Sequence, residues 1–565
     1  MDNAAKPRAE VDAIESLGRT RVVIVGGGIN GISTLRDLSL QGVDAVLVER
    51  ADFASGATAA SSHMIHGGIR YLENGEFRLV RESVRERNDL LRTAPHFVKP
   101  LQTTIPIYST FAGILAAPLR FLTHRSAKPG ARGALLIKVG LTLYDFFSRG
   151  GRAVPLHRFG GRRRTRQLLP ALDPRVAYSA TYFDAAVRDP ERLAIDVLLD
   201  ALDAHPGAHA VNYVEATGLS ATGVRLKDRE SGREFDLAAD VIVNATGPWA
   251  DLTNEAFGMP SKLTGGTKGS HIVLDHPELL AATAGREIFF EHSDGRIVLI
   301  YPLRDRVLVG TTDLEADPAQ VAECTEEEVD YFFDLIRHVF PSIAVDRSSI
   351  VYRFSGIRPL PRHGDLQPGF VSRDYRIEVA DRGQSAPVLT LIGGKWTTFR
   401  ALGESLATRV LGLLDVARTT ETLGLPIGGG RDFPSDREEW LARSLPGQSA
   451  ERRVVLFERY GTRAAEVAAQ LDADDDLLLG GYFSQAEIGL LVRTERVVHL
   501  TDLVLRRSDL GFAGRLDAVG LRALGAAVAG VLGWDDARAA SEIESCLPYT
   551  CQRTGGGAVL ERTTS

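Results

Sequence analysis

The spacing of apolar residues near the start of the chain predicts a strand, a helix and a second strand in direct succession. Residues 21–25 and 44–48 are mostly apolar runs of strand length. Between them, Ile32, Leu35 and Leu38 recur at helical spacing, so residues 29–41 are expected to form a helix that buries one face. The same reasoning predicts strands at 101–106, 241–243 and 388–392, a β-hairpin at 296–313 and a helix at 326–340.

The turn between the first strand and the helix carries a glycine pattern typical of dinucleotide binding. Gly26, Gly28 and Gly31 fall as G-x-G-x-x-G. The first permits a tight turn, the second lets backbone approach a pyrophosphate, and the third lets the helix pack closely on the strand. Glu49 ends the second strand, where an acid would bond the ribose hydroxyls and disfavour a 2′-phosphate. The pattern favours a dinucleotide site over an ordinary glycine-rich turn, and it is compatible with both FAD and NAD.

The composition narrows the class of protein. The chain has 565 residues, of which 44% are hydrophobic and 25% charged, as in a large globular protein of two or three domains. Its net charge of −7 argues against nucleic-acid binding by bulk electrostatics. The three cysteines show no metal-ligand spacing, so no metal is expected, and they are typical of a reducing cytoplasm. The first twenty residues lack the apolar core of a secretory signal.

A basic and apolar segment, residues 110–166, interrupts this acidic chain. It carries twelve arginines and lysines against a single aspartate, with apolar runs among them. No stretch of the chain reaches the roughly 20 uncharged apolar residues that span a bilayer. The segment is equally typical of contact with an anionic membrane surface and of a solvated basic face over a packed helix. We therefore expect any membrane contact to be peripheral.

Several cationic residues lie in loops rich in glycine and proline. His271 lies in GSHIV, Arg358 in GIRPLP and Lys395 in GGKWTT. A site with several arginine and lysine side chains favours a dianion such as a phosphate ester. Histidines add a proton acceptor with a pKa near neutrality. Each residue alone is a weak candidate, and the set gains weight as a whole: His66, Arg70, Tyr71, His271, Arg358, Arg373 and Lys395.

Several ordered motifs lie between about residue 21 and the C-terminal helical region. They read VIVGGGINGISTLRDLSLQG, SSHMIHGGIRYLENGEFRLVRESVRER, VIVNATGPW, KGSHIVL, VLVGTTD, YRFSGIRPL, VSRDYRI and GGKWTTFRALGE. In these motifs the chain closely resembles the FAD-dependent glycerol-3-phosphate dehydrogenases, the respiratory, quinone-linked enzymes of the D-amino-acid-oxidase-like flavoprotein superfamily. The family often has a Thr/Ser-rich run and a lysine before IHGG, where this chain has Ala57, Thr58, Ala59 and His63.

The resemblance implies that FAD is the cofactor and sn-glycerol 3-phosphate the substrate. A hydride would leave C2 for the flavin, giving dihydroxyacetone phosphate, and a membrane quinone would receive the electrons. Arg373 and Lys395 are then best suited to the phosphate, and Arg358 and His271 to holding and deprotonating the hydroxyl. The remaining substrate-site residues are His66, Arg70 and Tyr71. The residues expected at the FAD are Gly26, Gly28, Ile29, Asn30, Gly31, Glu49, Arg50, Thr58, Ser61, Ser62, Gly67, Ala245, Gly247, Trp249, Gly393, Gly394 and Thr397.

The resemblance also implies an α/β fold with three parts. They are a discontinuous Rossmann-like FAD-binding domain (about 20–100, 175–255 and 350–420), an antiparallel-sheet substrate domain (about 101–174 and 256–349) and a helical C-terminal domain (432–555). Patterns along the chain add three expectations, which are a flexible N-terminus at 1–19, a charged helix at 76–91 with a solvated face, and a glycine-rich linker at 425–431.

Two alternatives remain open on the sequence. An oxidase of the same family would pass its electrons to oxygen and share the substrate motifs, although the basic segment at 110–166 favours a quinone user. The second is a flavin-bearing, membrane-associated binding protein without turnover, against which the intact cationic set argues. The expected location is the cytoplasmic face of the plasma membrane, on an anionic lipid surface. The sequence is compatible with a homodimer.

Overall fold

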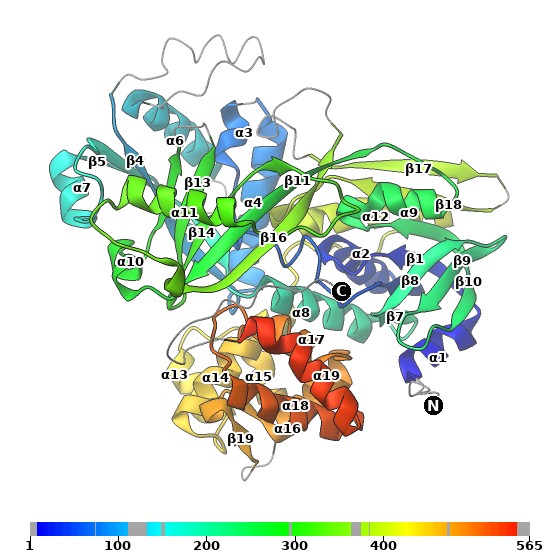
Figure 1. Cartoon of the computed structure of the whole chain (residues 1–565). Coiled ribbons are helices and arrows are strands. Elements are labelled where there is room, and N and C mark those ends of the chain that lie inside the picture. The colour runs from blue at the N-terminus through cyan, green and yellow to red at the C-terminus, as the bar shows by residue number, and fades with distance from the viewer. Residues whose placement is uncertain are drawn as a thin grey trace. The chain divides into compact units, whose positions relative to one another are not determined.

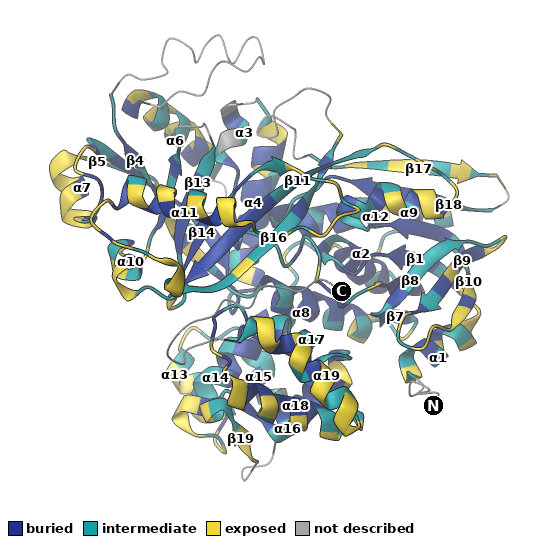
Figure 2. Ribbon diagram, in the orientation of Figure 1, coloured by how far each residue is buried: buried dark blue, intermediate teal, exposed yellow. Residues whose placement is uncertain are grey.

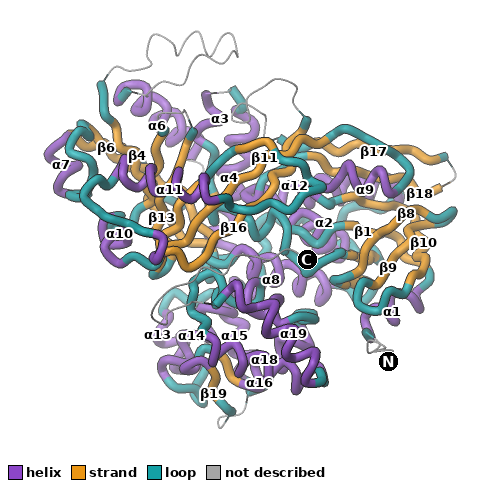
Figure 3. The backbone as a smooth tube through the Cα atoms, viewed as in Figure 1, coloured by secondary structure: helices purple, strands orange, loops and turns teal. Residues whose placement is uncertain are grey.

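The chain forms two compact units, Met1–Gln470 and Leu471–Ser565 (Figure 1). The computed structural model describes residues 8–73, 75–110, 133–148, 153–292, 296–362, 374–383, 385–471 and 475–550. The first unit contains two large β-sheets with helices packed on them, and the second is mostly helical (Figure 3). This confirms the predicted α/β class with a helical C-terminal region.

The first sheet is mostly parallel and is built on the predicted strand–helix–strand unit. β1 (Arg19–Val25) pairs in parallel with β2 (Ala45–Val48) and β10 (Glu234–Asn244), and α2 (Ile29–Leu40) connects β1 to β2. The order is β17-β18-β10-β1-β2-β7, with β8 and β9 joined on through β10. The remaining strands are β7 (Ala208–Val211), β8 (Val214–Leu219), β9 (Gly223–Asp228), β17 (Arg376–Arg382) and β18 (Ser385–Ile392).

Alternate residues of β1 contribute to two different cores. Val22 and Ile24 join the core that contains residues of α2, α8 (Pro190–Ala204) and α12 (Phe399–Leu414). Val23 and Val25 join the core formed with β8, β9 and α1 (Ala9–Leu17). A strand buried on both faces reads as a continuous apolar run, which is why residues 21–25 were recognisable in the sequence. Figure 2 shows this strand in dark blue.

The second sheet is largely antiparallel, and only the β12–β4 pair among its described strands is parallel. The order is β15-β11-β14-β13-β12-β4-β6-β3, with β16 on β11 and β5 on β6. The predicted hairpin is confirmed as β13–β14. The strands are β3 (Met64–Ile65), β4 (Val98–Ile107), β5 (Arg158–Gly161), β6 (Tyr178–Val187), β11 (Thr264–Leu274), β12 (Glu287–Glu291), β13 (Ile297–Leu303), β14 (Arg306–Gly310), β15 (Leu314–Glu315) and β16 (Ile350–Pro361).

Three longer helices pack on this second sheet. α11 (Glu326–Val339) begins at a capping box, in which Thr325 and Glu328 each accept a backbone N–H of the other, and it buries Phe332 and Ile336 against strands β11 to β14. A separate core joins α4 (Phe77–Thr93) and α6 (Ala134–Ser148) to β6 through Tyr144 and Tyr182. Side chains of α4, α6 and α11 therefore pack against strands of the second sheet.

The other helices are short or belong to the C-terminal region. In the first unit they are α3 (Ile69–Glu73), α7 (Arg162–Leu168), α9 (Ala250–Ala256), α10 (Pro277–Ala282), α13 (Arg437–Ser444), α14 (Ala450–Tyr460) and α15 (Ala464–Ala468). The second unit contains β19 (Leu477–Leu478), β20 (Phe483–Ser484), α16 (Gln485–Thr494), α17 (Leu500–Leu505), α18 (Ala518–Leu532) and α19 (Asp536–Cys546). The boundary expected at residue 432 remains a prediction.

Three expectations about local structure are wrong. The N-terminus expected to be flexible contains α1, whose Val11 and Ile14 are buried in a core. The expected linker at 425–431 contains a buried 3₁₀ turn (Gly428–Gly430), and a Cβ on Gly429 would lie 1.8 Å from the Tyr460 carbonyl oxygen. These glycines therefore serve close packing rather than flexibility. Strands β6 and β16, expected in the FAD-binding parts, belong to the second sheet.

The solvated charged face expected on α4 is confirmed in part, because Arg81 and Arg85 are exposed while other charged residues of the same helix are buried. Glu86 and Arg87 are 1% and 0% exposed, and Ser83 and Asp89 are also buried. Their charges are compensated inside the protein, since Arg400 donates to both carboxylate oxygens of Glu86 at 2.7 and 2.8 Å. Helical spacing shows which residues share a face, but not whether another element covers that face.

Candidate active site

The turn between β1 and α2 is packed too closely for side chains. A Cβ on Gly31 would lie 2.0 Å from the Gly26 carbonyl oxygen, and one on Gly26, at φ 113°, would lie 2.6 Å from the Ala245 carbonyl oxygen. Gly28 is the N-cap of α2 and supplies no side-chain cap, so backbone N–H groups at the helix start remain available. This geometry matches the roles predicted for the three glycines and forms a place for an anionic group.

Glu49 follows β2 and is held by backbone donors. Its carboxylate accepts hydrogen bonds from the Gly27 N–H at 2.7 Å and the Ala51 N–H at 2.9 Å. Burial raises the pKa of Glu49, while these two N–H groups act in the opposite direction. A carboxylate has about four acceptor positions, so the two backbone bonds leave capacity for ribose hydroxyls.

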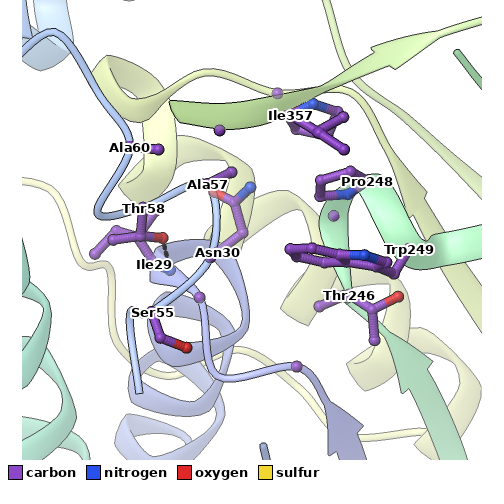
Figure 4. Close-up of a pocket in the computed structure, with 18 of the residues that line it drawn as sticks. Ile29, Asn30, Ser55, Ala57, Thr58, Ala60, Thr246, Pro248, Trp249 and Ile357 are labelled. Atoms are coloured by element: carbon purple, nitrogen blue, oxygen red, sulfur yellow. Dashed lines mark hydrogen bonds between the residues drawn. The ribbon is translucent and has the colours of Figure 1, made fainter. Parts of the chain in front are cut away.

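One cavity of about 570 Å³ joins the glycine turn to the second sheet. In Figure 4, Pro248 and Trp249 stand on one side, and Asn30, Ala57 and Thr58 stand on the other. Thr58 is fixed there because its Oγ accepts the Ile29 N–H at 3.0 Å. The cavity continues to residues of both sheets, so a long ligand that binds at the glycine turn would reach the cationic residues.

The residues present fit a dinucleotide such as FAD. The Asn30 side-chain oxygen is buried, lies beside the helix start and has no hydrogen-bond partner within the described residues. Trp249 lines the same cavity, and the Arg50 guanidinium lies 4.8 Å above its ring. A flat aromatic wall, an open helix terminus and a ribose-directed carboxylate are the features that such a ligand requires.

His271 and Arg358 line the cavity from neighbouring strands β11 and β16. Arg358 donates to the Asp313 carboxylate at 2.9 Å, to the Thr311 hydroxyl at 2.9 Å and to the Thr312 carbonyl at 3.1 Å. A Cβ on Gly269 would lie 1.9 Å from the guanidinium, so this glycine leaves the space that Arg358 fills. The arginine is thereby fixed at the cavity wall.

Lys395 lies between β18 and α12, at the second strand–glycine–helix junction. Its ammonium donates to the Ser83 hydroxyl of α4 at 2.8 Å and lies 4.7 Å from the centre of the Tyr71 ring. Lys395, Tyr71 and His66 line the same cavity as Arg358. The structure therefore gathers polar side chains that are separated by up to about 330 residues in the chain.

Most predicted site residues line this cavity, namely Gly26, Gly28, Ile29, Asn30, Glu49, Arg50, Thr58, Ser61, Ser62, His66, Tyr71, Ala245, Gly247, Trp249, His271, Arg358, Gly394 and Lys395. Thr397 lies behind it and accepts the His66 N–H at 3.2 Å. Gly31, Gly67 and Gly393 are also absent from the lining. Arg70 belongs to α3, but its side chain is not described, and Arg373 lies outside the described residues.

A buried polar network behind the cavity escaped the sequence analysis. One oxygen of Asp184 accepts hydrogen bonds from Arg87 at 2.7 Å, from the Tyr144 hydroxyl at 2.6 Å and from the Gly67 N–H at 3.0 Å. The network ties α4, α6 and β6 to the segment that carries His66 and Tyr71. No local pattern marks Asp184, which lies between Phe183 and Ala185 in a buried strand. Asp313, in contrast, lies inside a motif and could have been singled out.

Two features are absent from the part of the chain that the structure describes. No group of three or more His, Cys, Asp and Glu side chains there could hold a metal ion. None of the helices there is both long enough and apolar enough to cross a membrane.

Comparison with known proteins decides the family. The model of the FAD dependent oxidoreductase family matches residues 21–400. The chain belongs to this family. FAD, predicted from the resemblance, is therefore confirmed as the cofactor of its class. A second model, the C-terminal domain of alpha-glycerophosphate oxidase, matches residues 420–539 of this FAD-dependent oxidoreductase.

Individual relatives narrow the family further. A glycerol-3-phosphate dehydrogenase of Synechocystis sp. is 34% identical over 518 residues, covering 86% of this chain and 88% of the relative. A D-erythritol 1-phosphate dehydrogenase of Brucella abortus is 30% identical over 506 residues, covering 86% and 93%. A glycerol-3-phosphate dehydrogenase of Bacillus halodurans, solved with FAD, shares the fold with a TM-score of 0.72 at 21% identity, covering 97% and 99%. The resemblance to the glycerol-3-phosphate dehydrogenase family is confirmed.

Proposed function

We propose that this flavoprotein oxidises sn-glycerol 3-phosphate to dihydroxyacetone phosphate and passes the electrons to a membrane quinone. The observation that carries the proposal is the single cavity lined by both the dinucleotide turn and a cationic cluster with a buried histidine. Permanent cations suit a phosphate dianion, and a neutral imidazole suits the removal of a hydroxyl proton. The curated relatives named above act on phosphorylated polyols, as their names state, which supports the same substrate class.

Each residue of the cluster has a role in this proposal. Lys395 binds the phosphate, together with Arg373 and Arg70 by resemblance. Arg358 contacts the C2 oxygen and stabilises negative charge there as the proton leaves. His271 accepts that proton, because burial and the nearby Arg358 lower its pKa well below the ordinary value and keep the imidazole neutral at pH 7.

The FAD would be held by the glycine turn, by Glu49 at the adenosine ribose, and by Trp249 and Thr58 along the cavity. When bound, it supplies the acceptor for the C2 hydride. The protein residues orient the substrate and handle its phosphate and its proton. Walls formed by both sheets limit water access to the reacting atoms.

The test is anaerobic mixing of the purified yellow protein with glycerol 3-phosphate while the visible flavin absorbance is followed. Rapid bleaching is expected, and D-erythritol 1-phosphate serves as the comparison substrate. A quinone analogue added afterwards should restore the absorbance quickly. Absence of bleaching with either substrate would contradict the proposed oxidation. Bleaching with D-erythritol 1-phosphate alone would reassign the substrate.

The name of the second family model makes an oxygen-using oxidase the specific alternative. The same experiment separates the two, since an oxidase would be reoxidised rapidly by oxygen and would release peroxide. The substrate half-reaction is the same in both cases, so residues at the phosphate and at the hydroxyl do not distinguish them.

We infer that α6 and α7 contact an anionic membrane surface, from which the quinone would be reached. Leu135, Val139, Leu143 and Phe146 of α6 are 39–64% exposed and recur at helical spacing on one face. Helix α7, drawn in yellow in Figure 2, exposes its four arginines. Apolar residues near a basic helix are typical of binding in the lipid interface.

Cosedimentation with vesicles that contain anionic lipid tests this surface. Val139→Asp should weaken vesicle binding by about ten-fold or more, because it places a negative charge among apolar residues at the lipid surface. Val321→Asp is the matched control, since Val321 is 85% exposed and belongs to neither helix but to the loop before α11. Equal binding of both variants and the unchanged protein would exclude α6 as the membrane contact.

A further inference from the structure

The imidazole of His271 is locked between two neighbouring strands. In register, His271 of β11 lies opposite Gly310 of β14 and Phe354 of β16. The His271 and Phe354 rings are stacked, with centroids 4.8 Å apart and an interplanar angle of 11°. On the other side, a Cβ on Gly310 would lie 2.2 Å from Cδ2 of the imidazole. The ring therefore has little freedom to turn toward a ligand.

The polar contacts of this ring single out Ser62. The Ser62 hydroxyl lies 2.8 Å from Nε2 of His271. The other ring nitrogen, Nδ1, is buried and has no hydrogen-bond partner among the residues that the structure describes. His271 is only 1% exposed, whereas Ser62 is partly exposed and lines the cavity with Arg358 and Tyr71. A ligand oxygen in the cavity thus has access to Ser62, while Nε2 already faces the serine.

We propose that Ser62 is a catalytic residue that relays the proton of the substrate hydroxyl to His271. As the proposed oxidation removes the C2 hydride, the substrate O–H bond breaks and its proton bonds to Ser62 Oγ. The original Ser62 O–H bond breaks in the same step, and that proton bonds to Nε2 of His271. Serine is regenerated, the substrate oxygen becomes the carbonyl of the product, and His271 becomes an imidazolium. The relay rests on the proposed function, because it assumes that substrate.

The surroundings of His271 explain how the relay would return to its starting protonation state after each reaction. Burial, and after it the charge of nearby Arg358, disfavour the protonated form of His271 and lower its pKa. Neutral His271 is therefore ready to accept a proton in the resting protein. Once formed, the buried imidazolium beside Arg358 is unfavourable, so it gives its proton back through Ser62 to water that enters the cavity when the product leaves. The relay requires the tautomer in which Nδ1 carries the hydrogen.

Ser62 was expected among the FAD-binding residues, and a purely positioning role is the competing explanation. A hydroxyl that only orients the ring would still leave proton transfer directly between substrate and Nε2. In the relay two protons move, whereas in the positioning role one proton moves. Ser62→Ala would change only the His271 tautomer if Ser62 positions the ring, and it would also slow flavin reduction if Ser62 relays the proton.

The kinetic test uses stopped-flow flavin reduction by glycerol 3-phosphate with Ser62→Ala, His271→Ala, the double variant and Ser62→Thr. The relay predicts that Ser62→Ala slows reduction by about 10²–10⁴-fold, as for loss of general acid–base catalysis. The double variant should be no slower than His271→Ala, and Ser62→Thr should recover most of the rate. In the unchanged protein, a plot of the flavin reduction rate against the fraction of D₂O should be curved rather than straight, because two protons move together.

A substrate-free measurement separates this proposal from the proposed function. In ¹⁵N-histidine NMR, His271 should show a protonated Nδ1, and Ser62→Ala should shift its Nε2 signal. A protonated Nε2, a rate for Ser62→Ala within three-fold of the unchanged protein, or a linear dependence on D₂O would overturn the relay. If the unchanged protein were never bleached by glycerol 3-phosphate, the proposed function would fail, and the relay would fail with it.

Discussion

Replacing Arg87 by leucine removes the cation from a buried ion pair behind the cavity. The Arg87 and Asp184 side chains are 0% and 1% exposed, and Nη1 of Arg87 lies 2.7 Å from Oδ1 of Asp184. Without the guanidinium, the Asp184 carboxylate would keep two neutral donors, the Tyr144 hydroxyl and the Gly67 N–H. Removing one partner of a buried pair costs about 3–5 kcal/mol, because the other charge is left uncompensated. We expect a loss of that size in the free energy of unfolding.

Urea unfolding at pH 7, followed by protein and flavin fluorescence, measures this loss. Arg81→Leu is the matched control on the same helix, because Arg81 is exposed and should contribute less than about 1 kcal/mol. Substrate-dependent flavin bleaching should also slow in Arg87→Leu, since Asp184 anchors the segment next to His66. If the Arg87 and Arg81 variants unfold at the same urea concentration, the reasoning from burial is refuted.

Three further predictions concern the cavity. Lys395→Met should raise the KM for glycerol 3-phosphate by about 10–100-fold, because a charge-assisted hydrogen bond to the phosphate is lost. The flavin spectrum should stay unchanged. An unchanged KM in steady-state assays would exclude a role of Lys395 in phosphate binding. Gly269→Ala should displace Arg358 and lower kcat/KM by about ten-fold or more, whereas Gly140→Ala, in open space on α6, should not. Buried His63 has its pKa lowered to about 4, chiefly by burial. The unfolded state therefore binds its proton first as the pH falls, and stability should decrease by about 3 kcal/mol between pH 6.5 and 4. His63→Gln should flatten that decrease in urea midpoints measured across this range, and an unaltered slope would contradict the assignment.

The strand–helix–strand unit with its glycine turn could be predicted from the sequence because its signals are local. Val22 and Ile24 are buried on a strand, and Gly31 is required by its contact with Gly26, five residues before it. The close approach of Ala245 to Gly26, in contrast, belongs to the tertiary structure. Periodicity reports such features directly. A dinucleotide site followed from this unit, and the family resemblance supplied FAD and the rest of the candidate residues.

Other features were decided by the tertiary structure alone. Whether the charges of α4 meet solvent depends on Asp184 and Arg400, which come from elements about 100 and 300 residues further along the chain. Sequence periodicity does not reveal such partners, so the burial of Glu86 and Arg87 was not predicted. The contact between Ser62 and His271 is of the same kind, since it joins a loop to a strand 209 residues away. The sequence determined which chemical groups the chain carries and which local elements form. The packing of two sheets against one cavity decided which of those groups meet, because only burial and distance turn a set of separate side chains into a site.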